Sequence, residues 1–163
     1  MTSDSLRQAE RNRKRLREQL ASKQDAWVTA APEEKMRIQQ GIDDHKQLIK
    51  RADEEYWEIL ADESSEVQIT DDESEIIVAE IVGQAEKLSN SQDYSEEVLD
   101  WLEKIHKELT EPGVPAAAKL KGVVSSMPPF VGISYEAELD TEVFLRKNFP
   151  TFTKWIRGLK KKF

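Results

Sequence analysis

The sequence contains no cysteine among its 163 residues, so it can form neither a disulfide nor a zinc site with thiolate ligands. No run approaches the ~18 consecutive apolar residues that a membrane-spanning helix needs. The N-terminus is polar and charged, and it lacks the apolar region of a secretory signal peptide. These absences lead us to expect a soluble protein of the cytoplasm, where disulfides are rare.

The residue types that build active sites are also scarce. With only six glycines, the chain has little material for a phosphate-binding loop. The two histidines, His45 and His106, lie far apart, and neither has a second ligand nearby at the spacing of a metal site. No Ser/His/Asp or Cys/His set is recognisable. We therefore expect no enzymatic activity, no cofactor, no metal and no small-molecule substrate.

Charge, by contrast, is abundant and unevenly distributed. Charged residues make up 34% of the chain and apolar residues only 38%, a balance that is typical of long exposed helices and also of disorder. Residues 1–24 carry seven Lys/Arg and three acids, residues 61–111 three Lys and sixteen acids, and residues 146–163 seven Lys/Arg and no acid. Two interpretations are open: complementary charges attract within or between copies, or a basic end meets an anionic partner.

The first 62 residues predict an antiparallel coiled-coil hairpin. A heptad seam runs along a helix expected from about Pro32 to about Ala61, and a weaker seam runs upstream from Leu6 to Trp27. Pro32 suits the first position of the second helix. Because such thin arms cannot bury a core alone, we expect the seam to contact a partner or the rest of the chain, and we assign Ile38, Ile42, Ile49 and Tyr56 as partner-binding residues.

Residues 66–163 predict a small, mostly helical domain with one or two short β-strands. Capping patterns at Thr70 and Asp93 open two amphipathic helices. Apolar and polar residues then alternate from Val131 to Leu139, which predicts a strand that pairs with residues 67–69 or with a second copy. Asp140 or Thr141 is expected to cap the helix that comes next.

The last helix is basic and amphipathic. Phe152, Trp155, Ile156 and Leu159 share one face. This face either packs into the domain or binds an anionic membrane surface or an acidic partner. We assign as further partner-binding residues Trp155, Arg157, Lys160, Lys161 and Lys162.

Two segments resemble modules of known proteins. The first segment is APEEKMRIQQGIDDHKQLIKRADEEYWEIL. It resembles the coiled-coil hairpins of multidomain bacterial, especially cyanobacterial, conflict and signalling proteins. Segments attached to pentapeptide-repeat and effector-associated proteins of the same organisms are similar to PAAAKLKGVVSSMPPFVGISYEAELDTEVFLRKNFPTFTKWIRG. The resemblance implies adaptor duty, in which association couples a sensor NTPase or a caspase-like protease to an effector.

We therefore expect a non-enzymatic adaptor that self-associates or docks on a protein partner, in bacterial defence or signalling. The alternative is a peripheral binder of anionic membranes or nucleic acid that uses the basic C-terminal helix. Nucleic acid is disfavoured because the basic positions between Arg11 and Arg17 fan around their helix with no aromatic between them.

Overall fold

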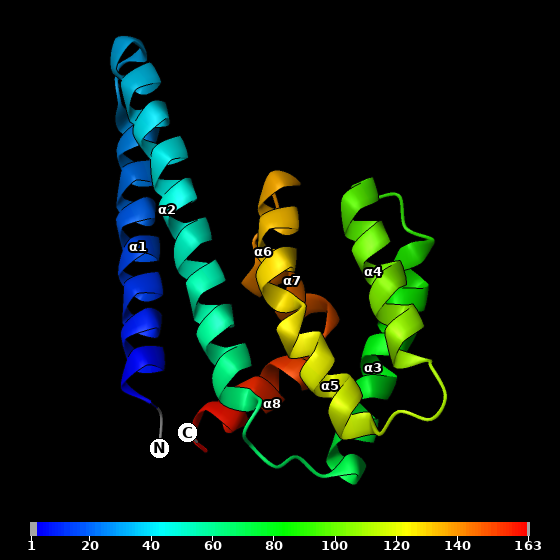
Figure 1. The fold of residues 1–163 in the computed structure, drawn as a ribbon. Helices are drawn as coiled ribbons and strands as arrows, with labels where there is room; N and C mark the ends of the chain where they lie inside the picture. The colour runs from blue at the N-terminus through cyan, green and yellow to red at the C-terminus, as the bar shows by residue number, and fades with distance from the viewer. Residues whose placement is uncertain (1–2, 163) are drawn as a thin grey trace.

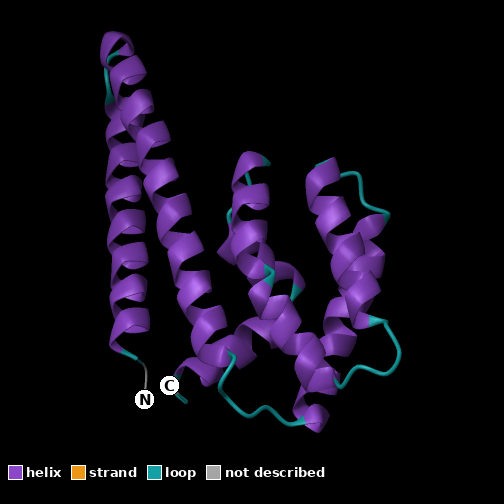
Figure 2. Ribbon diagram, in the orientation of Figure 1, coloured by secondary structure: helices purple, strands orange, loops and turns teal. Residues whose placement is uncertain are grey.

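The computed structural model describes residues 3–162, and the regular secondary structure of this part is entirely helical (Figure 2). Two long helices form a hairpin, and six shorter helices form a body beside its lower half (Figure 1). The helices are α1 (Asp4–Thr29), α2 (Pro32–Ser64), α3 (Asp71–Ser89), α4 (Glu96–Leu109), α5 (Ala116–Ser125), α6 (Met127–Glu136), α7 (Thr141–Asn148) and α8 (Pro150–Lys160). The helical class expected from the sequence is confirmed, and the strands are not present in residues 3–162.

The hairpin of α1 and α2 forms around the expected proline turn. The Ser3 side chain accepts a hydrogen bond from the Leu6 amide and so caps α1, while Pro32 begins α2, where its missing N–H costs nothing. Midway along the hairpin, His45 is buried and its Nε2 donates to the carbonyl oxygen of Leu16 at 2.7 Å. This bond fixes the register of the two arms.

Side-chain caps also open the helices of the body. Thr70 accepts from the Glu73 amide at the start of α3, as the capping pattern predicts. The cap of α4 is Ser95 rather than Asp93. Asp140 accepts from two amides at the start of α7, which decides between the two expected caps.

The strand predicted over residues 131–139 is wrong, because most of this segment is α6. Its buried positions, Met127, Phe130, Val131 and Ser134, follow the spacing i, i+3, i+4, i+7 of a helix. Ser134 hides this period in the sequence because it is polar, yet its hydroxyl is buried, donating to the Val131 carbonyl and pairing with the Thr141 hydroxyl. The two prolines that precede Phe130 lie in the first turn, where a helix tolerates them.

The other predicted strand, at residues 67–69, is also wrong. This segment belongs to the loop between α2 and α3, and Val67 and Ile69 pack against the core from that loop. Their alternation with polar neighbours therefore reflects a loop lying on an apolar surface.

One hydrophobic core joins the hairpin to the body. Leu6 of α1 and Trp57 and Leu60 of α2 belong to the same buried cluster as Phe130 of α6 and Phe152 of α8. The Trp57 and Phe152 rings stack with their centroids 6.3 Å apart. The lower half of the hairpin is therefore part of the core, while the upper half rises beyond the body (Figure 1).

The last helix, α8, lies across the base of the molecule (Figure 1). Its first amides donate to Glu80 of α3, with Thr151 N 3.0 Å from the carboxylate. Its apolar residues Phe152, Trp155, Ile156 and Leu159 are all buried. Among residues 3–162, no helix combines the length and apolarity that crossing a bilayer requires.

Candidate functional site

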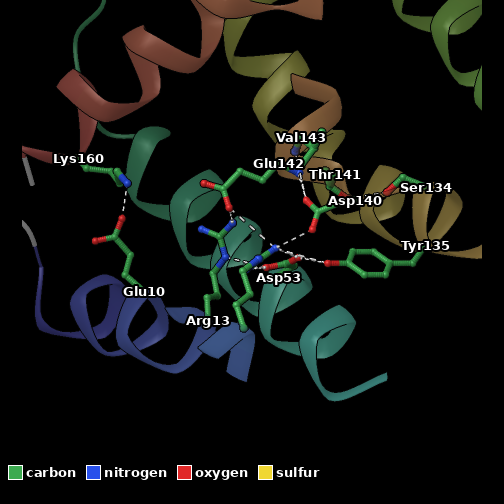
Figure 3. A network of polar contacts seen from close by, with 11 residues as sticks. Glu10, Arg13, Asp53, Ser134, Tyr135, Asp140, Thr141, Glu142, Val143 and Lys160 are labelled. Carbon is green, nitrogen blue, oxygen red and sulfur yellow. Dashed lines mark hydrogen bonds and ion pairs between the residues drawn. The ribbon is translucent and has the colours of Figure 1, made fainter. Parts of the chain in front are cut away.

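The Asp53 carboxylate on α2 is the centre of the largest group of side-chain hydrogen bonds and ion pairs among residues 3–162. Its side chain is 1% exposed, yet it accepts hydrogen bonds from three different side chains (Figure 3). Arg13 Nε lies 2.7 Å away, Arg17 donates through both terminal nitrogens at 3.0 and 2.8 Å, and the Tyr135 hydroxyl lies 2.6 Å away. Such a carboxylate is fully satisfied although it is buried.

Two further acids complete this group from the start of α7. Glu142 lies 3.4 Å from Arg13 Nη2, and Asp140 lies 3.7 Å from Arg17 Nη2 (Figure 3). We call this group the joint network, and it consists of Arg13, Arg17, Asp53, Tyr135, Asp140 and Glu142. It draws on α1, α2, α6 and the start of α7, so it ties the hairpin to the body at mid-height.

The charges of the joint network shift one another's pKa values. Burial alone would raise the pKa of Asp53, but the attraction of Arg13 and the hydrogen bonds from Arg17 outweigh it and lower that pKa below its ordinary value of 3.8. Burial and the adjacent Asp53 charge raise the pKa of Tyr135. Asp53 therefore stays ionised and Tyr135 stays protonated at neutral pH.

This chemistry favours a structural joint over a reactive centre. Arg13 and Arg17 keep their protons because the attraction of Asp53 outweighs the burial that would lower the pKa of each. Arg13, Arg17, Asp53 and Tyr135 thus each hold one charge state near pH 7, which suits a structural ion-pair network. Within residues 3–162, no cluster of three or more His, Asp or Glu side chains is placed to hold a metal ion.

The sequence does indicate part of the joint network, but only when the apolar stripes of the two hairpin helices are compared with each other. Arg13 stands at an apolar seam position of the first helix, and Asp53 follows Ile49 by four residues on the buried face of the second. Opposite charges on facing apolar stripes predict a buried pair. The role of Tyr135 could not be predicted from the sequence, because its partner Asp53 lies 82 positions away in the chain.

The assigned seam residues are largely covered by the chain itself. Tyr56 is 3% exposed and packs beneath Arg13, whose guanidinium carbon lies 3.9 Å from the ring centroid. Ile42 and Ile49 are buried and Ile38 is half-buried. These four residues do not together present an open surface to a partner.

The assigned residues of the last helix divide into two groups. Trp155 is buried, and its indole nitrogen has no hydrogen-bond partner within the described part of the chain. Lys160 is half-buried and pairs with Glu10 of α1 (Figure 3). Arg157, Lys161 and Lys162 are exposed. A membrane could meet only the basic side of α8, because its apolar side lies in the core.

Several exposed apolar residues, which were not among the assigned partner-binding residues, lie elsewhere. Met36 is 82%, Val28 69% and Trp27 36% exposed. All three flank the turn at the far end of the hairpin, which stands clear of the body (Figure 1). We call Trp27, Val28 and Met36 the hairpin tip.

A groove between α3 and α8 lies at the opposite end of the molecule. Its cavity measures about 380 Å³, and Ile76 on its wall is 69% exposed. Gly158 of α8 lines it, and a Cβ added there would meet nothing within 4 Å. We call this cavity the α3–α8 groove, and its lining also includes Glu73, Ile77, Thr151, Lys154, Trp155, Leu159 and Lys162.

No related protein provides a known site with which these three features could be aligned. Comparisons with protein-family models, with curated proteins and with solved structures find no match to this chain.

Proposed function

We propose that the chain is a non-enzymatic interaction module that self-associates head to tail, with the hairpin tip of one copy seated in the α3–α8 groove of the next. The observation that carries the proposal is the exposure of the tip. Met36 and Val28 are the most exposed large apolar side chains on the hairpin, and they sit at its far end. Apolar residues gathered on a projecting element are typical of an interaction surface.

The groove supplies a matching surface. Its apolar wall contains the exposed Ile76, and Gly158 leaves room for a side chain from outside. A glycine inside a helix is destabilising by about 1 kcal/mol relative to alanine, so its presence at an open wall favours a role in close approach. The volume of about 380 Å³ lies within the ~300–1,000 Å³ of typical ligand pockets.

Charge complements the apolar match. The last turn of α1 at the tip has no basic residue of its own, and α2 begins there with Glu33 and Glu34. Glu34 pairs with Arg37 and Lys35 lies over the Trp27 ring, so Glu33 is the acid that the tip offers to the groove. The groove is flanked by the exposed lysines Lys154 and Lys162, against the single acid Glu73.

The positions of the two surfaces decide the geometry of assembly. The turn between α1 and α2 lies at the opposite end of the molecule from α8 and the start of α3 (Figure 1), which line the groove, so a tip reaches only the groove of another copy. An interface between two different surfaces is heterologous, and it generates chains or rings instead of a closed two-fold dimer. Such an assembly agrees with the adaptor duty that the sequence resemblance implies.

The test is a mixing experiment followed by sedimentation velocity across a wide concentration range. The tip variant carries Val28→Gln and Met36→Gln, and the groove variant carries Ile76→Gln and Gly158→Gln. All four positions are solvent-exposed, so the fold should tolerate the changes. We expect the wild type to grow in mass with concentration, each variant to stay monomeric, and an equimolar mixture to form pairs that grow no further.

The control is Leu48→Gln, which removes an exposed leucine from α2 away from both surfaces and should leave assembly unchanged. A wild type that stays monomeric up to millimolar concentration would overturn self-association. A mixture that fails to pair, although each variant is monomeric, would overturn the seating of the tip in the groove. A groove variant that still assembles, while the tip variant stays monomeric, would show that two tips contact each other instead.

A further inference from the structure

A second cavity, of about 510 Å³, lies where α1, α2, α7 and α8 meet. It is separate from the tip and from the α3–α8 groove, so a ligand can occupy it whether or not the chain self-associates. We call this cavity the basic cleft, and its lining consists of Glu10, Arg13, Lys14, Arg17, Glu18, Ala21, Tyr56, Trp57, Glu142, Leu145, Phe152, Thr153, Ile156, Arg157 and Lys160.

The cleft brings together the two basic ends of an acidic chain. The sequence places its clusters of Lys and Arg in residues 1–24 and 146–163, and the fold sets α1 beside α8, where Lys160 pairs with Glu10. Five cations and three carboxylates line the cleft, although the whole chain has a net charge of −8.

Ion pairs take up three of the five cations of the lining. Arg13 and Arg17 are held by Asp53 and Glu142, and Lys160 by Glu10. Lys14 and Arg157 have no ion-pair partner among residues 3–162. Glu18 is the one carboxylate of the lining that also lacks a partner in the described part of the chain, so two free cations face one free acid.

The floor of the cleft is apolar and contains packed aromatic rings. Trp57 and Phe152 stack with an interplanar angle of 7°, and the Tyr56 ring meets Trp57 edge-on at a centroid distance of 5.4 Å. Leu145 and Ile156 add further apolar lining. A floor of packed rings beneath free cations is the pattern of a pocket that holds an apolar body and orients it through one polar group.

We infer that the basic cleft binds a small amphipathic anion, whose carboxylate or phosphate head meets Lys14 and Arg157 while its apolar body lies over Trp57 and Phe152. A free acid and the head of an anionic lipid share this chemistry. The head meets the two cations that the chain's own carboxylates leave unpaired, and the aromatic floor excludes water from the apolar body.

The experiment titrates decanoate, below its micelle concentration, into the full chain by calorimetry and by tryptophan fluorescence. Decanol is the uncharged analogue and should bind at least about tenfold more weakly, because it cannot form charge-assisted hydrogen bonds. The variant Lys14→Gln with Arg157→Gln should lose a similar factor for decanoate and little for decanol. Trp57→Phe should remove most of the fluorescence response while calorimetry still detects binding.

A matched control removes the same charge far from the cleft. Lys104→Gln with Lys107→Gln changes two exposed lysines of α4 and should leave decanoate binding unchanged. Equal affinity for decanoate and decanol, or equal loss in both double variants, would overturn the inference.

A second arm separates the two sources of the anion. Vesicles of phosphatidylglycerol are compared with vesicles of phosphatidylcholine by co-sedimentation, with the same two double variants. Binding to the anionic vesicles that fails only in the Lys14/Arg157 variant would assign the cleft to a lipid head, and binding of decanoate alone would assign it to a free acid. Failure of both probes would overturn the inference.

Discussion

At the scale of single residues, Asp53 shows how a buried charge can be tolerated between two packed elements. Removing a carboxylate from water is expensive, and the protein compensates with two arginines and one phenol placed within 3.0 Å of it. The arrangement works only as a set. If the carboxylate is lost, two guanidinium groups are left facing each other without their shared acceptor.

We therefore expect Asp53→Asn to lower the free energy of unfolding by about 3–5 kcal/mol, since it leaves Arg13 and Arg17 with only the half-buried Asp140 and Glu142 as counter-charges. Urea denaturation of the variant and the wild type measures the difference. Glu55→Gln, an exposed change two residues away, should alter stability by no more than about 0.5 kcal/mol. If Asp53→Asn lowers the free energy of unfolding by no more than Glu55→Gln does, the structural role of the network is contradicted.

The lowered pKa of Asp53 predicts a pH dependence with a definite sign. A carboxyl whose folded pKa lies below its unfolded value binds fewer protons when folded, so its contribution to stability is complete above about pH 4 and falls as the pH drops through the folded pKa. The stability gap between the wild type and Asp53→Asn should hence be constant from pH 7 to about pH 5 and narrow below pH 4. A gap that widens in acid would contradict this assignment.

At the scale of elements, the sequence predicted helices wherever apolar residues formed a clean stripe. The hairpin, its proline turn and the cap at Thr70 were all readable in this way. The pattern failed at α6 because Ser134 occupies a buried helical position while Ile133 and Tyr135 on either side of it are apolar. The Ser134 hydroxyl donates a hydrogen bond to the Val131 carbonyl, which allows it to be buried. The sequence alone does not reveal such a bond, so the position cannot be recognised as buried before the packing is known.

The helical state of α6 has a direct test at Gly132. A Cβ there would meet only the ends of the Glu54 and Lys50 side chains, at 3.8 and 3.9 Å, which is ordinary contact. Gly132→Ala should thus raise the free energy of unfolding by about 0.5–1 kcal/mol, because alanine loses less backbone entropy in a helix. Thermal or urea unfolding measures the gain.

The contrasting variant is Gly113→Ala. Gly113 has φ +84°, a conformation that is strained for alanine, so this change should lower stability by about 1–2 kcal/mol. If Gly132→Ala lowered stability as much as Gly113→Ala does, the result would argue against a helix at α6.

At the scale of the whole molecule, the expected boundary between a hairpin at residues 1–62 and a domain at residues 66–163 crosses a continuous core. Trp57 and Leu60 of α2 pack with Val124 of α5 and Phe152 of α8 in one buried cluster. The long-range contacts that build this core, and the joint network above it, depend on how helices pair in space. Periodicity along the chain contains no information of that kind.

A fragment of residues 66–163 should accordingly unfold without cooperativity, because it lacks the side chains of α1 and α2 that complete its core. Thermal melts followed by near-ultraviolet circular dichroism measure this. Addition of a separate fragment of residues 1–65 should restore a sharp transition, since the cut falls in the loop after α2. A sharp transition of the 66–163 fragment by itself would show that the body is independent of the hairpin.

The contact between α1 and α8 also sets an order of events during synthesis. Glu10 and Lys160 are separated by 150 positions, and Leu6 shares its core with Leu159. On the ribosome, α1 and α2 emerge early and can pair at once, but the apolar base of that hairpin stays uncovered until residue 160 has left the exit tunnel. For that interval the nascent chain exposes Trp57 and Leu60, so a chaperone that shields apolar surface would have its longest opportunity there.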